Sequence, residues 1–260
     1  MSKRTNTLNP QALPLGRRMR DWMFDNLGKP LLRSYFKVLN HLCRAAAGGN
    51  KRPVFYDVKT VYPSLQILED NVEVIKAEFQ KILLKKSTLP RYHELDDIQT
   101  DISETTQNDW KVFMLQVCGE NADIRDQCPL TRSLLEQIPY VNQAFFSILD
   151  ARKSVPAHDG PYCGYLRYHL GIEIPKDNSP HIRILNERHV WQQDKGVLFD
   201  DSWNHEVINN CDEIRVVLLV DVLRPLPGWL HKLNVGWTRY VGKHYSRRLL
   251  GRLASNDYTI

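Results

Sequence analysis

The chain has 260 residues, of which 42% are hydrophobic and 25% charged, and its formal net charge at pH 7 is +5. This length suits one domain with a sizeable core, and the composition argues against a disordered chain and an integral membrane protein. We find no apolar run of about 18 residues and no apolar signal-peptide core near the start, which predicts a cytoplasmic protein. Five cysteines without C-x-x-C spacing predict free thiols rather than a zinc site or disulfides.

Charge is unevenly distributed along the chain. Residues 1–50 carry +7 and residues 226–260 carry +5, so the segment between them carries −7. An acidic middle with two basic ends does not suit a nucleic-acid-binding protein and favours ends that meet an anionic surface. We therefore predict a basic amphipathic N-terminal tail over 1–50, a catalytic domain over 51–225 and a basic amphipathic C-terminal tail over 226–260.

Both tails have the periodicity of amphipathic helices. Apolar side chains repeat at helical spacing over residues 32–42 and 230–241, with basic side chains between them, and Trp229 and Trp237 are candidate interfacial anchors. Two explanations remain open. The helices contact a membrane, which would make the protein peripheral on a membrane face, or they pack on the protein's own core.

The middle segment changes from helical to strand-like patterns. Residues 64–84 and 130–138 predict helices, and the polar stretch 94–109 predicts a surface loop. After Val141, short apolar runs alternate with Gly, Pro, Asn and Asp; they read AFFSIL, YLRYHLGIEI, IRIL, VLFD, HEVI and IRVVLLVDV. Short strands at this spacing are typical of an all-β sandwich or barrel.

Two of these strands carry basic side chains on one face. Alternation over 165–174 puts Arg167 and His169 on one face and apolar side chains on the other. In the last run, Arg215 shares its face with Val217 and Leu219, an unfavourable position for a cation without a buried anion. That anion is either a carboxylate of the protein, in a structural ion pair, or a bound dicarboxylate.

His158 precedes the first of these strands and His205 begins another. Neutral imidazoles are suitable Fe(II) ligands and leave other coordination positions open. The chain has nine histidines, so the spacing of two of them does not by itself identify a site.

From about Phe55 to Pro225 the chain resembles the aspartyl/asparaginyl β-hydroxylase family of Fe(II)- and 2-oxoglutarate-dependent dioxygenases. The resemblance rests on an ordered set of segments, which is more specific than any one motif. In chain order these segments are DWKVFML, CPLTRSLLEQIP, FFSIL, HDGPYCGYLRYHLGIEIP, FDDSWNHEV and IRVVLLVDVLRP.

The resemblance implies a mainly β fold with flanking helices, built on a double-stranded β-helix of the cupin-like jelly-roll type. It implies Fe(II) held by His158 and His205, with 2-oxoglutarate and O₂ as cosubstrates. It assigns the distal carboxylate of 2-oxoglutarate to Arg215. Further residues match cosubstrate contacts or an aromatic near the active site; they are Ser147, Arg167, His169 and Trp110.

The third ligand position departs from the common His-x-Asp pattern. Gly160 stands where an aspartate usually does, and Asp159 in an extended strand would point to the opposite face. The resemblance places glycine there in animal members and aspartate in lipid-hydroxylating bacterial relatives, and it leaves a position that a water or a halide could fill. Asp200 and Asp201 precede His205 and are either groups that orient it or solvated loop carboxylates.

The acceptor stays open between different classes. One hypothesis is hydroxylation of the acyl chain of a membrane lipid, and a second is β-hydroxylation of an aspartyl or asparaginyl residue or a carrier-bound amino acid. A third is a non-catalytic cupin-like module that binds 2-oxoglutarate.

Overall fold

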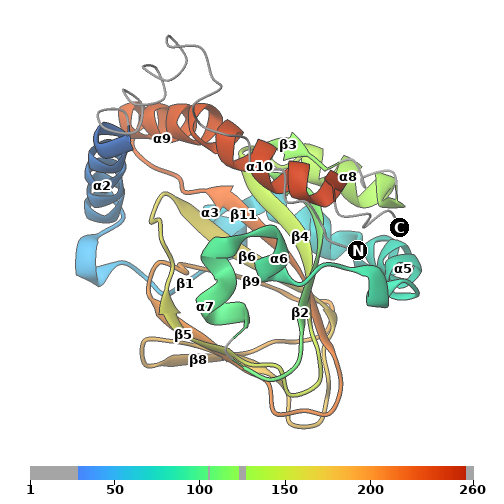
Figure 1. Cartoon of the computed structure of the whole chain (residues 1–260). Helices are drawn as coiled ribbons and strands as arrows, with labels where there is room; N and C mark the ends of the chain where they lie inside the picture. The colour runs from blue at the N-terminus through green and yellow to red at the C-terminus, as the bar shows by residue number, and fades with distance from the viewer. Residues whose placement is uncertain (1–28, 105, 123–126, 256–260) are drawn as a thin grey trace.

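Two antiparallel sheets face each other in the computed structural model, which describes residues 29–104, 106–122 and 127–255 (Figure 1). The larger sheet has the strand order β1-β9-β6-β11-β4-β2-β3. Its strands are β1 Phe55–Tyr56, β2 Trp110–Val117, β3 Glu120–Asn121, β4 Val141–Leu149, β6 Tyr165–Glu173, β9 Gly196–Phe199 and β11 Arg215–Leu223.

The smaller sheet has the order β5-β10-β7-β8. Its strands are β5 Val155–Asp159, β7 His181–Ile184, β8 Glu187–Val190 and β10 Asn204–Ile208. From β4 to β11 the chain passes repeatedly between the two sheets, which is the winding of a double-stranded β-helix. The predicted fold class is therefore confirmed, and its physical basis is that the inward side chains of both sheets bury one another.

Four helices cover the outer face of the larger sheet. They are α3 Val58–Val61, α4 Gln66–Asp70, α5 Val72–Leu83 and α8 Pro129–Glu136. Phe79 of α5 packs on Phe146 of β4 with ring centroids 4.8 Å apart, and the Glu78 carboxylate accepts the Leu130 and Thr131 amides at the start of α8. The predicted helices over 64–84 and 130–138 are thus present, the first interrupted at Asn71.

The predicted loop over 94–109 is wrong in its first half. Helix α6 Tyr92–Leu95 and helix α7 Thr100–Ser103 flank a short 3₁₀ turn over Asp97–Gln99. The Glu94 side chain accepts the Arg91 amide, which caps α6, and Leu95 is fully buried. The polar composition hid these helices because each is a single turn that is anchored by few apolar residues.

The described part of both tails is helical and packs on the barrel. Helix α2 Lys29–Ala46 buries Leu39 and Cys43 against the segment that follows β5, while α9 Gly228–Tyr240 buries Leu230 and α10 Gly242–Ser255 buries Leu249. Residues 1–28 and 256–260 of the predicted tails lie outside the described residues. Among the helices described, none is both long and apolar enough to cross a membrane.

Candidate active site

All seven side chains predicted for the site line one small cavity between the two sheets. Its volume is about 30 Å³. These seven residues are Trp110, Ser147, His158, Arg167, His169, His205 and Arg215. They come from several strands of both sheets, so the winding of the barrel, rather than proximity in sequence, brings them together.

His158 and His205 lie side by side on neighbouring strands of the smaller sheet. They are directly paired in the register of β5 and β10, and their ring centroids are 4.2 Å apart. His158 lies within β5, a short strand that the sequence pattern did not reveal.

The tautomers of both imidazoles follow from their hydrogen bonds. The Nδ1 atom of His158 lies 2.8 Å from the Pro156 carbonyl oxygen, and Nδ1 of His205 lies 2.8 Å from that of Trp203. A carbonyl only accepts, so each Nδ1 carries the proton and each Nε2 keeps a lone pair. Burial lowers the pKa of both rings, that of His205 to about 3. Two neutral Nε2 donors fit a divalent metal ion.

Arg215 begins β11 of the larger sheet, lines the same cavity and is 2% exposed. Its guanidinium lies 3.9 Å from the centre of the Trp191 ring, and Nη1 donates a long 3.5 Å hydrogen bond to Ser147 Oγ. Nε and Nη2 have no partner, and among the described residues no carboxylate forms an ion pair with it. Burial lowers the pKa of Arg215 to about 9. The protein thus leaves a buried cation without an anion, which a bound carboxylate would satisfy.

Other polar groups of the cavity also lack protein partners. His169 is 5% exposed and neither ring nitrogen is hydrogen-bonded, while burial and then Arg215 hold its pKa well below the usual range. Ser147 Oγ accepts from Trp110 Nε1 at 3.0 Å and from Arg215 Nη1 at 3.5 Å, which leaves its own proton for another acceptor. Unsatisfied buried donors are costly, so their concentration here indicates a place for a polar ligand.

Arg167 differs from Arg215 because protein carboxylates already occupy it. It forms a bidentate pair with Asp221 at 2.8 and 2.9 Å, and its Nη1 lies 2.9 Å from Asp201 Oδ2. Tyr165 also donates to Asp201 at 3.1 Å. Sequence reasoning missed Asp221, although an aspartate on the inward face of the apolar run IRVVLLVDV, six residues after Arg215, was the available signal.

The two aspartates before His205 are buried rather than solvated. Asp200 accepts from Arg52 and Arg224 at 2.7 Å each, which ties the turn after α2 and the end of β11 to this loop. Asp201 leaves its Oδ1 without a partner, and burial raises its pKa. Among the described residues, neither carboxylate forms a hydrogen bond with His205, whose Nδ1 instead contacts the Trp203 carbonyl. The predicted role of Asp200 and Asp201 in orienting His205 directly is therefore not supported by a hydrogen bond.

Gly160 lies against the backbone of Asp201. Its amide donates to the Asp201 carbonyl at 3.0 Å, and a Cβ on Gly160 would lie 2.4 Å from that oxygen. Asp159 points away, with an exposed carboxylate that accepts from Asn204 at 3.0 Å. Within the described residues no group of three or more His, Cys, Asp or Glu is placed to hold a metal ion.

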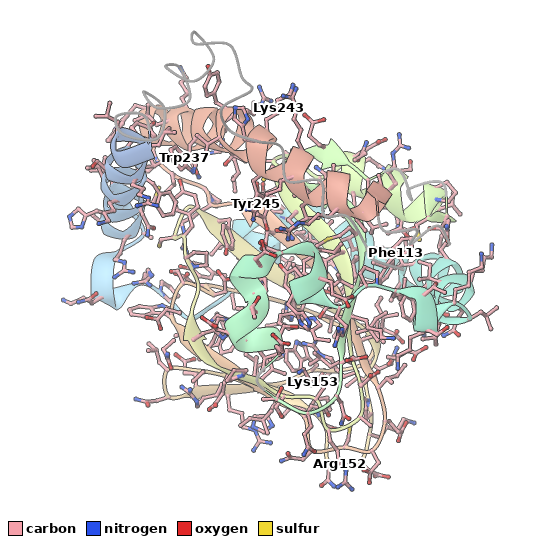
Figure 2. The ribbon with its side chains drawn as sticks, in the orientation of Figure 1. Phe113, Arg152, Lys153, Trp237, Lys243 and Tyr245 are labelled. Atoms are coloured by element: carbon pink, nitrogen blue, oxygen red, sulfur yellow. The ribbon has the colours of Figure 1, made fainter. Side chains whose placement is uncertain are left out.

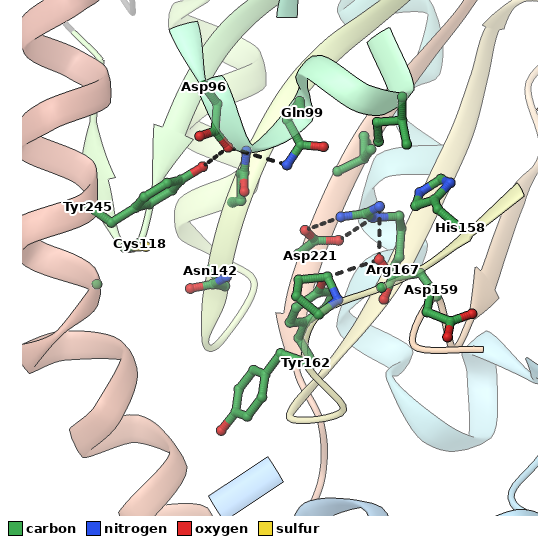
Figure 3. Close-up of a pocket in the computed structure, with 18 of the residues that line it drawn as sticks. Asp96, Gln99, Cys118, Asn142, His158, Asp159, Tyr162, Arg167, Asp221 and Tyr245 are labelled. Carbon is green, nitrogen blue, oxygen red and sulfur yellow. Dashed lines mark hydrogen bonds and ion pairs between the residues drawn. The ribbon is translucent and has the colours of Figure 1, made fainter. Parts of the chain in front are cut away.

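A larger pocket of about 730 Å³ adjoins the cavity and shares Trp110, His158, Arg167 and Leu219 with it (Figure 3). Figure 3 shows Arg167 with its ion pairs beside His158, and Tyr245 of α10 on the far side, hydrogen-bonded to Asp96. Its outer walls come from α2, α9, α10 and the segment of α6 and α7. Sequence reasoning did not reveal this pocket, because its walls come from the tails and from the supposed loop.

Comparisons with known proteins identify related hydroxylases. The family model described as aspartyl/asparaginyl beta-hydroxylase matches residues 69–225. The chain is 40% identical over 177 residues to an ornithine lipid ester-linked acyl 2-hydroxylase of Rhizobium tropici, covering 67% of this chain and 62% of that protein. It is 31% identical over 185 residues to the aspartyl/asparaginyl beta-hydroxylase of Homo sapiens, covering 68% of this chain and 23% of that protein.

The match therefore spans less than two thirds of the length of either relative. Among solved structures, a Cupin 2 conserved barrel domain protein from Salinispora arenicola is 11% identical, with a TM-score of 0.29, covering 50% of this chain and 86% of that one. That score is too low to carry an argument, and the fold assignment rests on the strand order.

Proposed function

Because the chain belongs to the aspartyl/asparaginyl β-hydroxylase family, we propose that it is a hydroxylase that uses Fe(II), 2-oxoglutarate and O₂, and that its acceptor is the acyl chain of a membrane lipid. The observation that carries the proposal is the buried Arg215 without an anion, in one cavity with two facing imidazoles. Fe(II) would complete the site formed by the two imidazoles, and the dicarboxylate 2-oxoglutarate would supply the anion that Arg215 lacks.

In this proposal Nε2 of His158 and Nε2 of His205 hold the iron, and Arg215 pairs with the distal carboxylate of 2-oxoglutarate. When bound, the iron supplies the oxidising chemistry that removes hydrogen from an unactivated C–H bond. His169 would orient the cosubstrate through ring nitrogens that have no protein partner, and Ser147 would do so through its hydroxyl proton. The apolar side chains around the cavity exclude water, which strengthens each of these contacts.

The large pocket supports the lipid acceptor. A volume of about 730 Å³ accommodates an extended chain, and aromatic and aliphatic side chains form much of its wall. These include Phe36, Phe145, Tyr162 and Trp237. The greater identity to the Rhizobium lipid hydroxylase points the same way. The alternative acceptor is an aspartyl or asparaginyl side chain, as the name of the human relative indicates.

We expect the anaerobic protein with Fe(II) and 2-oxoglutarate to show a visible charge-transfer band. His158→Ala and His205→Ala should each abolish it, because each removes one of two protein ligands. His41→Ala, on the exposed side of α2, is the matched control and should keep the band. A well-folded wild-type protein without a band, and without conversion of 2-oxoglutarate to succinate, would favour the non-catalytic binding module instead.

The acceptor is tested by mass spectrometry of two substrate sets under identical conditions. We expect a gain of one oxygen on the acyl chain of an aminolipid in mixed micelles, with the succinate formed matching the hydroxylated product. Peptides that contain aspartate or asparagine should remain unmodified. Oxygen incorporated into the peptides and not the lipid would establish the alternative acceptor.

A further inference from the structure

Helix α2 carries two apolar stripes, and only one of them is packed. Side chains spaced by four, three and four residues form the packed stripe; these are Leu32, Phe36, Leu39 and Cys43. One position before each of the first three lies a large apolar side chain exposed to solvent: Leu31 is 68%, Tyr35 42% and Val38 59% exposed. A helix that only packed on the barrel would need the packed stripe but not the exposed one.

Helix α9 repeats this arrangement. Leu230 and Trp237 pack inward, while Trp229 is 60%, Leu233 41% and Tyr240 81% exposed. Figure 2 shows Trp237 of α9 near α2. Tyr35 of α2 stacks on this ring, with centroids 5.3 Å apart. We name the six exposed side chains the α2/α9 face: Leu31, Tyr35, Val38, Trp229, Leu233 and Tyr240.

This concentration is unusual within the described residues. Twelve large hydrophobic side chains are strongly exposed there, and six of them belong to the α2/α9 face. The other six are spread over α5, α8, the β8 hairpin and a turn before β4. Helices α2 and α9 contact each other, and exposed apolar side chains concentrated on neighbouring elements, rather than scattered singly, indicate an interaction surface.

The charge of the same helices indicates the kind of partner. Helices α2, α9 and α10 contain ten Lys or Arg and no Asp or Glu. Three cations of α10, Lys243, Arg248 and Arg252, pair with protein carboxylates, so the charge open to a partner lies mainly on α2 and α9. A second copy of the chain would bring these like charges together in a two-fold contact, which is unfavourable. An anionic bilayer is complementary to both properties, because it accepts apolar side chains at the interface and attracts the surrounding cations.

We propose that the α2/α9 face docks on an anionic lipid bilayer. Leu31, Val38 and Trp229 enter the interfacial region, and lysine and arginine side chains of α2 and α9 contact the headgroups. Phe36 and Trp237, on the packed sides of these two helices, also line the large pocket, so docking brings a pocket wall close to the membrane. That last step rests on the proposed lipid acceptor, whereas the docking itself does not.

The test is sedimentation of the full-length protein with vesicles, without iron or 2-oxoglutarate. We expect binding to vesicles of phosphatidylcholine mixed with phosphatidylglycerol, little binding to phosphatidylcholine alone, and release at high salt. A variant with Leu31→Gln, Val38→Gln and Trp229→Gln should bind at least about tenfold more weakly, because three apolar anchors are lost.

The matched control places the same three changes at exposed apolar positions elsewhere. Leu84→Gln, Leu130→Gln and Val190→Gln, at sites 87%, 55% and 38% exposed, should bind as the wild type does. The proposal would be overturned if neither the wild type nor the control sedimented with anionic vesicles. It would also be overturned if the α2/α9 variant bound as tightly as the wild type. A dimer in ultracentrifugation that this variant converts to monomer, without vesicle binding, would instead assign the face to self-association. The outcome is independent of succinate formation, so failure of docking and failure of the proposed activity are distinguishable.

Discussion

Replacement of Arg215 by methionine is expected to stabilise the ligand-free protein while abolishing the binding of 2-oxoglutarate. Arg215 is a fully buried cation whose Nε and Nη2 have no partner, and burial lowers its pKa to about 9. The folded state therefore carries an uncompensated charge at neutral pH. An apolar side chain of similar volume should increase the free energy of unfolding by about 1–4 kcal/mol, partly offset by the lost contact with Trp191.

Two arginines among the described residues line the cavity, Arg167 and Arg215, and protein carboxylates pair with Arg167. Arg215→Met therefore removes the guanidinium that has no carboxylate partner. We expect the affinity for 2-oxoglutarate to fall by roughly 100-fold or more, because the ligand would bury a carboxylate without its partner. Thermal unfolding with and without 2-oxoglutarate measures both effects. The wild type should gain stability from the ligand, and Arg215→Met should begin higher and gain nothing.

Arg224→Met is the contrasting control. Arg224 is 3% exposed and pairs with Asp200 at 2.7 Å, so its removal leaves a buried carboxylate with a lost partner. This variant should lose about 3–5 kcal/mol of stability. If Arg215→Met were destabilised to the same extent, Arg215 would be a structural residue, and the carboxylate site assigned to it would be wrong.

The sequence predicts the barrel well because its signals are local. Alternating apolar runs bounded by turn residues identify the long strands, and the ordered motifs single out His158, His205 and Arg215. These three residues and four others line one cavity between the sheets, as the resemblance implies. Strand periodicity alone also puts Arg167 and His169 on one face, and both line that cavity.

The environment of those residues could not be predicted in the same way. Arg167 pairs with Asp221 and Asp201, whereas Arg215 has no carboxylate partner among the described residues. This difference depends on the register of β6 against β11 and on the buried loop that carries Asp201. The large pocket depends on tertiary packing of α2, α9 and α10, whose periodicity is equally compatible with a membrane and with a core. In the structure each of α2 and α9 has a packed side and an exposed apolar side, so the two explanations are compatible.

Gly160 shows how a short-range pattern conceals a long-range constraint. Comparison with the His-x-Asp pattern suggests an empty ligand position that an aspartate could fill. The structure instead places the Asp201 carbonyl oxygen 2.4 Å and the Asp201 Cγ 3.0 Å from the Cβ that any other residue would carry. The space next to the backbone is already taken, by main-chain atoms that cannot simply rotate away.

Gly160→Ala is therefore expected to destabilise the protein by about 1–3 kcal/mol through overpacking against Asp201. Gly160→Asp should cost more, because it also brings a second carboxylate beside that of Asp201 in a buried region. We expect neither variant to bind Fe(II) more tightly than the wild type, since the backbone shift that relieves the clash moves the strand end that carries His158. Chemical denaturation and the charge-transfer band with 2-oxoglutarate measure the two effects.

Gly251→Ala is the matched glycine control, because a Cβ at this position in α10 would meet nothing within 4 Å. It should leave the band unchanged and raise stability by up to about 1 kcal/mol through helix propensity. An unperturbed Gly160→Asp protein with a stronger band would show that residue 160 can move away from Asp201. The third position would then be a vacant ligand site rather than one closed by the Asp201 backbone.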